Sequence, residues 1–279
     1  MRLITNDEQL LAHLPNIVST VRSERPFFER LAPQLDLAER WVVETFTSPS
    51  LHDELANSPD HENLRTILRR LIAADAMRRA IPAMDLVLTP NGFGVVSTQN
   101  LAPASRARVE ALMASMRTAI DECIAALLPA LARCSGWLGS AQARWFGATL
   151  FPFPDIVNVV GQGDAPTKWE AYKKMRQTII GLEASLADEW LSPELLSALR
   201  RENLRGTLSD ERRAVVGHTR SQLIAYLRDG SFSSRRLADI VNYIRQRPGD
   251  FPEWHGSEVA GLFAPPVFRN YKRSGGYFF

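Results

Sequence analysis

Apolar side chains recur every three or four residues along most of the chain, which is the spacing that places them on one face of a helix. The clearest case runs from Ser105 to Leu128, where the apolar positions alternate with charged ones. Weaker patterns of the same period predict helices over residues 7–19, 26–47, 49–57, 62–83, 167–191, 210–227 and 234–246 and from residue 193 onward. The sequence therefore predicts a mainly α protein built as a helical bundle.

One apolar stretch, Asp85–Ser105 (DLVLTPNGFGVVSTQNLAPAS), breaks this helical pattern. It is β-prone, with a short strand expected at Leu86–Leu88 and another at Val95–Val96. Between them, Thr89–Gly92 provides a turn, because Pro presets φ and Asn-Gly tolerates positive φ. We predict a short β-hairpin insertion that must be buried either on the chain's own helices or on a neighbouring molecule.

Two segments resemble each other along the chain. Glu39–Ala56 aligns with Glu183–Arg200 at a constant offset of 144, and both segments contain a Ser-Pro pair, a common start of a helix. A following ENLR recurs at 62–65 and 202–205, at an offset of 140. The recurrence indicates two similar helical modules.

These patterns suggest four parts. They are a first helical module (1–135, with the hairpin at 85–97), a connecting segment (136–166), a second helical module (167–249) and an extended C-terminal tail (250–279). Within the connecting segment, Phe151–Val160 is β-prone. Whether the two modules share one core stays open.

The tail carries features suited to contact with other surfaces. Pro265-Pro266 favours an extended path, and a short helix is possible near Ser257–Phe263. The tail ends with Gly275-Gly276 followed by three aromatic residues, 277–279. Exposed aromatic residues lower solubility unless they dock in a groove. Docking onto the chain's own core and docking onto another subunit are both open.

Composition narrows the class of protein. Hydrophobic residues make up 45% and charged residues 23% of the chain, which is typical of a folded soluble domain. The net charge of +2 implies no global attraction to nucleic acid. Cys123 and Cys134 match no common metal or redox spacing, so we expect free thiols. No signal-peptide pattern or membrane-length apolar run occurs, so we expect a soluble, non-secreted protein.

A search for catalytic and cofactor motifs gives no candidate. The five histidines lack a metal-ligand spacing, and the glycine pairs near Gly92 and Gly161 continue as neither a dinucleotide fingerprint nor a phosphate loop. No nucleophile elbow occurs. Arginine pairs at 69–70, 78–79, 200–201, 212–213 and 235–236 are dispersed and have acidic neighbours. We therefore expect no enzyme activity, no cofactor and no metal, and at most non-specific contact with DNA.

The chain resembles a group of uncharacterised proteins encoded in phages and prophages of Bacteroides and related bacteria. The resemblance lies in DLVLTPNGFGVVSTQNLAPAS (Asp85–Ser105), in RLIT (Arg2–Thr5), in DFPEW (Asp250–Trp254) and in GGYFF (Gly275–Phe279). That group is interpreted as head–tail connector, or adaptor, proteins. The resemblance implies a mostly helical virion component, assembled in the bacterial host cytoplasm as a ring, commonly of twelve copies, beneath the portal.

Three hypotheses follow. The first is a connector that contacts its own copies, the portal protein and the tail or neck proteins. Its expected interface residues are Leu88, Pro90, Asn91, Phe93, Val95, Phe268, Tyr271, Tyr277, Phe278 and Phe279. The second is a monomeric helical enzyme or ligand-binding protein with a pocket between the modules, lined by Trp169, Tyr172, Trp190 and His218. The third is a DNA-binding regulator whose arginines gather on one helix face.

Overall fold

The computed structural model describes residues 2–14, 25–58, 61–84, 86–89, 92–95 and 105–265, and it is mainly helical, which confirms the predicted fold class. The first half contains α1 (Asp7–Leu11), α2 (Phe27–Val42), the π-helical turn η1 (Val43–Thr47), α3 (Pro49–Asn57), α4 (Glu62–Ala80), the 3₁₀ turn η3 (Ile81–Ala83), strands β1 (Leu86–Thr89) and β2 (Gly92–Val95), α5 (Arg106–Leu131), α6 (Ser135–Leu138) and α7 (Ala141–Phe146). The second half contains α8 (Asp155–Val160), α9 (Lys168–Leu186), the π-helical turn η4 (Ala187–Leu191), α10 (Pro193–Arg205), α11 (Asp210–Asp229), α12 (Ser234–Arg245), α13 (Pro252–His255) and α14 (Glu258–Leu262).

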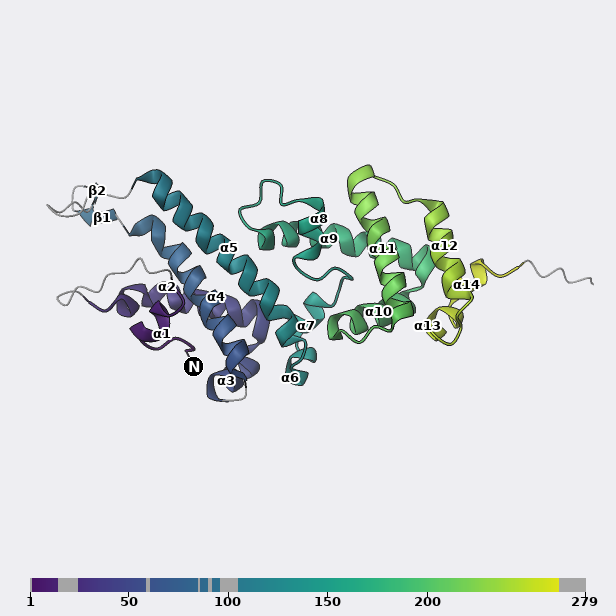
Figure 1. The fold of residues 1–279 in the computed structure, drawn as a ribbon, viewed down its shortest axis with the longest axis horizontal. Helices are drawn as coiled ribbons and strands as arrows, with labels where there is room; N and C mark the ends of the chain where they lie inside the picture. The colour runs from purple at the N-terminus through teal and green to yellow at the C-terminus, as the bar shows by residue number, and fades with distance from the viewer. Residues whose placement is uncertain are drawn as a thin grey trace, which may run out of the picture.

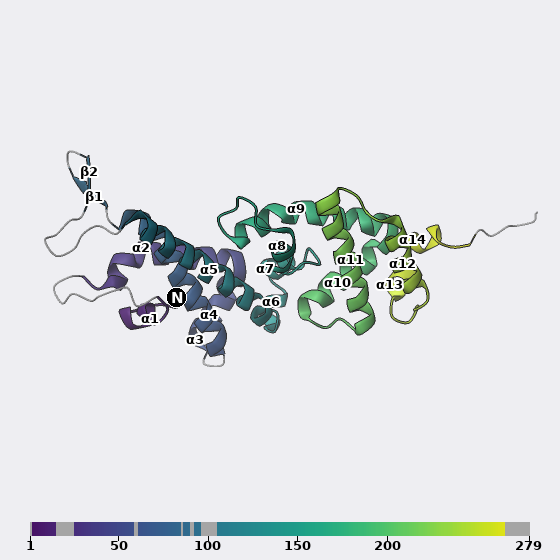
Figure 2. The same cartoon turned by 45° about the horizontal axis from the view of Figure 1, so that its top comes forward.

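The molecule is elongated, with the two halves placed end to end (Figures 1 and 2). In the first half, α4 packs between α2 and α5. Helix α5 runs from the hairpin end of the molecule to its middle, where α6 and α7 follow (Figure 1). Helices α10 to α14 form the opposite end. Buried apolar side chains form one continuous cluster from Leu3 to Trp254, so the described parts of both halves share a core.

Strands β1 and β2 pair in antiparallel fashion within the segment predicted to form a hairpin. Leu86 pairs with Val95, and Thr89 pairs with Gly92. The two strands lie at one end of the long axis, beyond the start of α5 (Figure 1). A two-stranded ribbon is only marginally stable alone, so this element depends on what it packs against.

The offset of 144 found in the sequence marks a repeated local structure. A π-helical turn precedes Ser48 and another precedes Ser192, and each serine has a positive φ, of 85° and 68°. The Oγ of each serine accepts a hydrogen bond from the backbone N–H three residues later, at 3.5 Å from Leu51 and 3.2 Å from Leu195. The following proline occupies the first turn of the next helix in both places.

This geometry predicts opposite effects for two substitutions at Ser192. The serine lies at φ 68° and ψ 145°, a region that costs a residue with a Cβ about 1–3 kcal/mol. Ser192→Gly removes that strain at a capping cost of only a few tenths of a kcal/mol, so we expect stabilisation by about 1 kcal/mol. Ser192→Ala keeps the strain and loses the cap, so we expect destabilisation by about 1 kcal/mol. Urea unfolding of both variants measures the two signs, and equal shifts in one direction would contradict the strain argument.

The repeat extends to buried positions in the segments that open each half, in α3 and α10, in α4 and α11, and in α5 and α12. At an offset of 147, Leu3, Ile4 and Leu10 correspond to Leu150, Phe151 and Val157. At 144, Leu51, His52 and Leu55 correspond to Leu195, Leu196 and Leu199. At 151, buried α4 positions 64, 65, 68, 71 and 72 correspond to buried α11 positions 215, 216, 219, 222 and 223. At 117, buried α5 positions 120, 123, 124 and 127 correspond to buried α12 positions 237, 240, 241 and 244.

These correspondences define an N-terminal module, residues 2–147, and a C-terminal module, residues 149–264. The boundaries differ from the expected ones because the expected connecting segment, 136–166, is divided between the modules: α6 and α7 complete the first, and Leu150 to α8 begin the second. The recurrence of ENLR at an offset of 140 does not belong to this structural repeat. Glu62–Arg65 starts α4, whereas Glu202–Arg205 ends α10.

The β-prone interpretation of Phe151–Val160 is wrong for its second half. Residues Asp155–Val160 form α8, because Asp155 favours a helix start and a helical turn places Ile156 and Val157 together in the core. Tertiary packing here outweighs the β propensity of the valines.

In the described part of the tail, residues 250–265, the short helix expected near Ser257–Phe263 is confirmed as α14, whereas the extended path expected for the rest of this part is wrong. This part is folded as α13 and α14, and Phe251 and Trp254 are buried against the C-terminal module. The Trp254 indole N–H donates to the carbonyl of Trp190 at 2.9 Å, which ties α13 to η4. The remainder of the tail lies outside the described residues.

Candidate functional site

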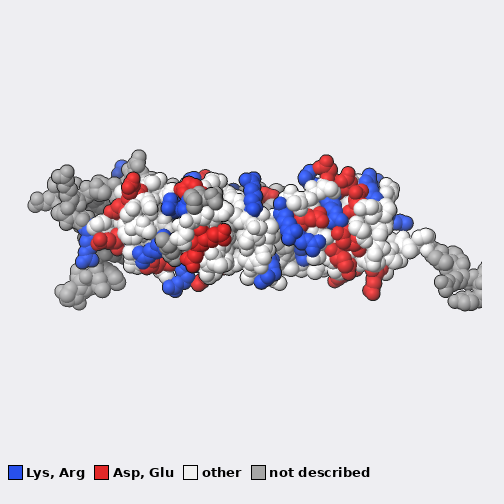
Figure 3. Space-filling model, turned by 90° about the horizontal axis from the view of Figure 1, so that it is seen from below, with Lys and Arg blue, Asp and Glu red and all other residues white. Residues whose placement is uncertain are grey.

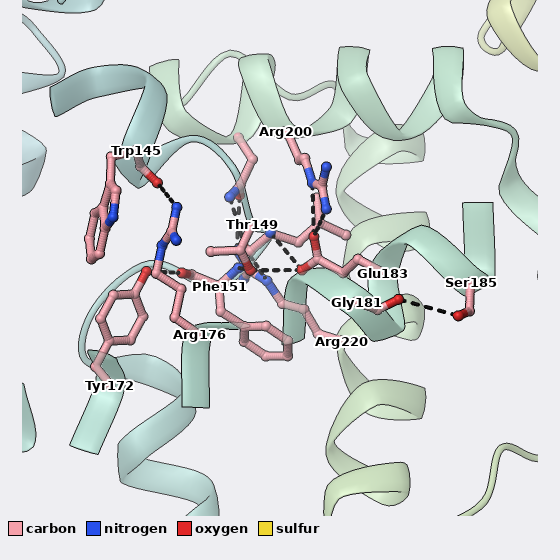
Figure 4. A network of polar contacts seen from close by, with 12 residues as sticks. Trp145, Thr149, Phe151, Tyr172, Arg176, Gly181, Glu183, Ser185, Arg200 and Arg220 are labelled. Atoms are coloured by element: carbon pink, nitrogen blue, oxygen red, sulfur yellow. Dashed lines mark hydrogen bonds and ion pairs between the residues drawn. The ribbon is translucent and has the colours of Figure 1, made fainter. Parts of the chain in front are cut away.

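A buried polar network lies where the C-terminal module begins, and Figure 4 shows it at close range. Its centre is Glu183 on α9, whose side chain is fully buried. The Glu183 carboxylate accepts from the Thr149 hydroxyl at 2.7 Å and from the backbone N–H of Leu150 at 2.8 Å. Its other oxygen accepts two hydrogen bonds from the Arg200 guanidinium, at 2.8 and 2.6 Å. The carboxylate therefore has four donors.

The backbone carbonyl of Leu150 also accepts several hydrogen bonds. It accepts from Arg220 Nε at 2.9 Å and from the Asn203 amide at 3.0 Å, and Arg220 also donates to the Asn203 side-chain oxygen. Leu150 is thus fixed through both of its backbone polar groups. The network anchors the extended segment that opens the C-terminal module, since buried backbone groups must find partners.

The electrostatics of Glu183 fit a structural role. Burial raises the pKa of its carboxyl, and the nearby Arg200 guanidinium and the donors from Leu150 and Thr149 oppose that rise. A carboxylate that already accepts four hydrogen bonds has little capacity left to accept a substrate proton. We conclude that this group holds the fold together and is no general base.

The N-terminal module contains a simpler version of the same network. Glu39, the counterpart of Glu183, accepts from the backbone N–H of Leu3 at 2.7 Å and pairs with His52 at 3.0 Å. Arg69, the counterpart of Arg220, donates to the carbonyl of Leu3 at 2.9 Å. Each module therefore clamps one leucine of an extended segment between a glutamate and an arginine, which supports a structural role for both networks.

Aromatic side chains join the two modules. Trp169, at the start of α9, lies 5.3 Å from Phe46, 5.7 Å from Trp145 and 5.9 Å from Phe146 between ring centroids. On the same α9 start, Asp121 of α5 accepts from the backbone N–H groups of Lys168 and Trp169 at 2.8 and 3.0 Å. The junction therefore combines aromatic packing with a capped helix end.

Two adjacent cavities open at this junction. The first, of about 360 Å³, is lined mainly by apolar side chains from the end of α5, the α7–α8 connection and the end of α10, together with Arg133 and Arg205. The second, of about 350 Å³, is lined by α7 and α10 and includes Arg144, Arg200 and Arg201. No carboxylate lines either cavity. Lys and Arg side chains gather near the middle of the molecule in the view of Figure 3.

The four residues expected to line a pocket do not meet in one. Trp169 and Tyr172 are buried in the aromatic junction, and the Tyr172 hydroxyl donates to the carbonyl of Phe151 at 3.1 Å. Trp190 packs against Phe263 near the far end of the C-terminal module. His218 lines a separate groove between α11 and α12. The structure brings together only the first two.

Most of the arginines considered for phosphate contact are engaged within the chain. Asp75 pairs with Arg78 and Arg79 at 2.6 Å each, and Arg212 pairs with Glu202 and Glu253 at 2.7 and 2.8 Å. The Asp75 pairs lie within α4, whereas the Arg212 pairs join α11 to α10 and α13. Together they leave few of the paired arginines for a helix-borne DNA-reading face. Among the described residues, no group of three or more His, Cys, Asp or Glu side chains is arranged to hold a metal ion.

Only three of the expected interface residues belong to the part of the chain that the structure describes. Leu88, Phe93 and Val95 lie in the paired strands, where Leu88 is opposite Phe93. Pro90, Asn91, Phe268, Tyr271 and residues 277–279 lie outside the described residues. No described helix is both long and apolar enough to cross a membrane.

The matches at offsets of 144 and 140 did not predict the junction between the modules or the second half of the repeat. Residues 137–147 (WLGSAQARWFG) and 254–264 (WHGSEVAGLFA) share Trp, Gly-Ser, Ala and Phe at a constant offset of 117. This match would have placed the module boundaries correctly. It lies at a different offset from the first match because α5 is longer than α12 and follows the hairpin.

Comparison with known protein families finds a match for one part of the chain. Residues 24–147 match a family of unknown function, DUF6712. The match runs from just before α2 to the end of the N-terminal module. No curated protein matches the chain, and no solved structure does.

Proposed function

We propose that the protein is a structural component of a phage virion, a head-to-tail connector that forms a ring at the portal vertex. The observation that carries the proposal is the placement of its two unusual segments. The hairpin strands lie at one end of the long axis, and α14, from which residues 266–279 continue, lies at the other (Figure 1). Such a subunit offers a different contact at each end, as a ring of identical subunits requires.

The polar chemistry of the chain is consistent with this proposal. Glu183, Glu39 and Asp75, which are buried or nearly so, are each held by donors from the same chain. Their contacts stiffen an elongated scaffold. The resemblance of Asp85–Ser105 and Gly275–Phe279 to phage adaptor proteins supports the same assignment.

Assembly with a portal tests the proposal. The purified chain is mixed with a portal protein from a related phage, and the complex is examined by negative-stain microscopy and native mass spectrometry. We expect a ring of several copies on the portal. A chain that stays single and leaves the portal unoccupied at all concentrations would overturn the proposal.

Removal of Ser274–Phe279 is expected to abolish ring or portal binding and to leave the helical circular dichroism nearly unchanged. All the described helices end before this segment, so its removal deletes none of the residues that give the helical signal. The matched control replaces Tyr277, Phe278 and Phe279 with serine in the full-length chain. Normal assembly of both variants would contradict a role for the aromatic end.

A second candidate function is favoured by the cavity of about 360 Å³ at the junction. Its apolar lining with Arg133 and Arg205 suits a small amphiphile with an anionic head. Oleate and inorganic phosphate serve as probes in thermal unfolding. A rise in Tm with oleate that is lost in Arg205→Gln, in a chain that stays single, would favour ligand binding over the connector.

A further inference from the structure

The junction between the modules shows how this fold docks against another copy of itself. The N-terminal module offers what we term the junction face: Phe46 of η1 together with Trp145 and Phe146 of α7. Trp169 of the C-terminal module packs on all three. As a result Phe46 is fully buried and Phe146 is 5% exposed.

The C-terminal module carries the equivalent surface, which we term the distal face: Trp190, Leu262 and Phe263. Trp190 follows Phe46 by 144 positions, the offset of the π-helical turns. Leu262 and Phe263 follow Trp145 and Phe146 by 117 positions, the offset of α5 and α12. The distal face is therefore located by offsets established elsewhere in the fold.

Hydrogen bonds confirm that the two faces are built alike. The Trp137 indole N–H donates to the carbonyl of Phe46 at 2.5 Å, and the Trp254 indole N–H donates to the carbonyl of Trp190 at 2.9 Å. Ser140 caps α7 and Ser257 caps α14, with hydroxyl-to-N–H distances of 3.0 and 3.3 Å. The indole hydrogen bond and the serine cap that support the junction face are thus both present beneath the distal face.

The faces differ in what covers them. Leu262 is 72% exposed, the largest exposure of any large hydrophobic side chain in the described residues, and Trp190 and Phe263 are only partly buried. Within the described chain, no third module packs on the distal face as the second packs on the junction face. An apolar surface of this kind, with a built support, is typical of a docking site.

We propose that the distal face receives the N-terminal module of a second copy of this chain, so that copies join head to tail. By the offset of 144, the residues that would approach it are Arg25 and Phe28, the counterparts of Trp169 and Tyr172. Arg25 is exposed, and Phe28 is only partly buried. An arginine in place of the tryptophan can stack on the Trp190 indole, as Arg176 stacks on Trp145 at 3.9 Å from its ring centroid in the junction.

Charge at the distal end suits that partner. Asp188 and Glu189 precede Trp190 on η4, and Glu258 opens α14; all three are exposed. Acidic groups around the apolar face favour an approaching arginine and disfavour an acidic partner. The same contact repeated from copy to copy is heterologous, so it generates a closed ring or an open filament. Only the expectation of closure into a ring rests on the function proposed above.

Sedimentation equilibrium of the full-length chain tests the contact. We expect the wild-type chain to self-associate and Leu262→Asp to weaken association at least tenfold, with an unchanged Tm because the side chain is exposed. The control is Leu37→Asp, which places the same charge at a leucine 48% exposed on α2. A wild-type chain that stays monomeric at all concentrations, or a Leu262→Asp chain that associates as the wild type does, would overturn the proposal.

Cross-linking tests the identity of the occupant. In a Cys134→Ser background, chains carrying Arg25→Cys are mixed with chains carrying Leu262→Cys and treated with a short bismaleimide. We expect cross-linked dimers in the mixture and far fewer in either variant alone. A mixture that yields no more dimer than the single variants would overturn head-to-tail docking and would point to residues 266–279 as the cover of the face. Portal binding is measured separately, so a chain that self-associates but binds no portal refutes only the connector.

Discussion

Glu183→Leu is expected to lower the free energy of unfolding by about 3–5 kcal/mol, the usual cost of removing one partner from a buried ion pair. The leucine keeps most of the side-chain volume, so the effect measures polar contacts. Arg200, the Thr149 hydroxyl and the Leu150 N–H all lose their acceptor. Guanidinium chloride unfolding followed by circular dichroism gives the value.

Two further variants sharpen this prediction. Glu39→Leu, at the equivalent position of the N-terminal module, is expected to cost less, because the Glu39 side chain is 12% exposed and its partner is His52. Glu189→Gln, on the exposed part of η4, is expected to change stability by less than about 0.5 kcal/mol. Equal losses for Glu183→Leu and Glu189→Gln would show that the network contributes nothing specific.

Trp169→Ala is expected to uncouple the two modules and to cost about 3–5 kcal/mol, as large-to-small changes of buried aromatic residues do. Trp169 is 3% exposed and contacts aromatic rings of both modules. We expect the wild type to unfold in one thermal transition and the variant, with its junction weakened, to unfold in two. Differential scanning calorimetry measures both the shift and the number of transitions.

The matched control for this prediction is Phe232→Ala. Phe232 is a partly buried aromatic residue that packs on Tyr226 at 4.5 Å, beside the α11–α12 turn and away from the junction. Its removal is expected to destabilise the C-terminal module without changing the number of transitions. A Trp169→Ala chain that melts in one transition near the wild-type temperature would show that the modules are coupled elsewhere.

The helices were predictable because their signals are local. The apolar period of α5 and the Ser-Pro starts of α3 and α10 depend only on neighbouring residues, and the structure shows all three. The π-helical turns could not be predicted in this way. They widen the last turns of α2 and α9 so that Ser48 and Ser192 can reverse the chain, and no residue type specifies them alone.

The polar clamps and the junction depend on contacts distant in sequence. In the sequence, Glu183 is indistinguishable from any other helix glutamate. Its contacts with Thr149, Leu150 and Arg200 exist only in the folded chain. Leu262 reads as a core position of a short helix, yet it is largely exposed. Burial is set by which module lies alongside, which periodicity within one helix does not encode.

The two modules differ in the connection between one pair of equivalent helices. Between α4 and α5 the N-terminal module carries the hairpin strands, whereas α11 and α12 are joined directly through Gly230–Ser233, with Gly230 at φ 74°. The same helical arrangement therefore forms with either a long or a short connection at this position. We expect insertions between these two helices to be tolerated without changes in the helices themselves. The same tolerance makes the exposed residues Gly230 and Ser231 a natural place to graft a fluorescent or affinity label.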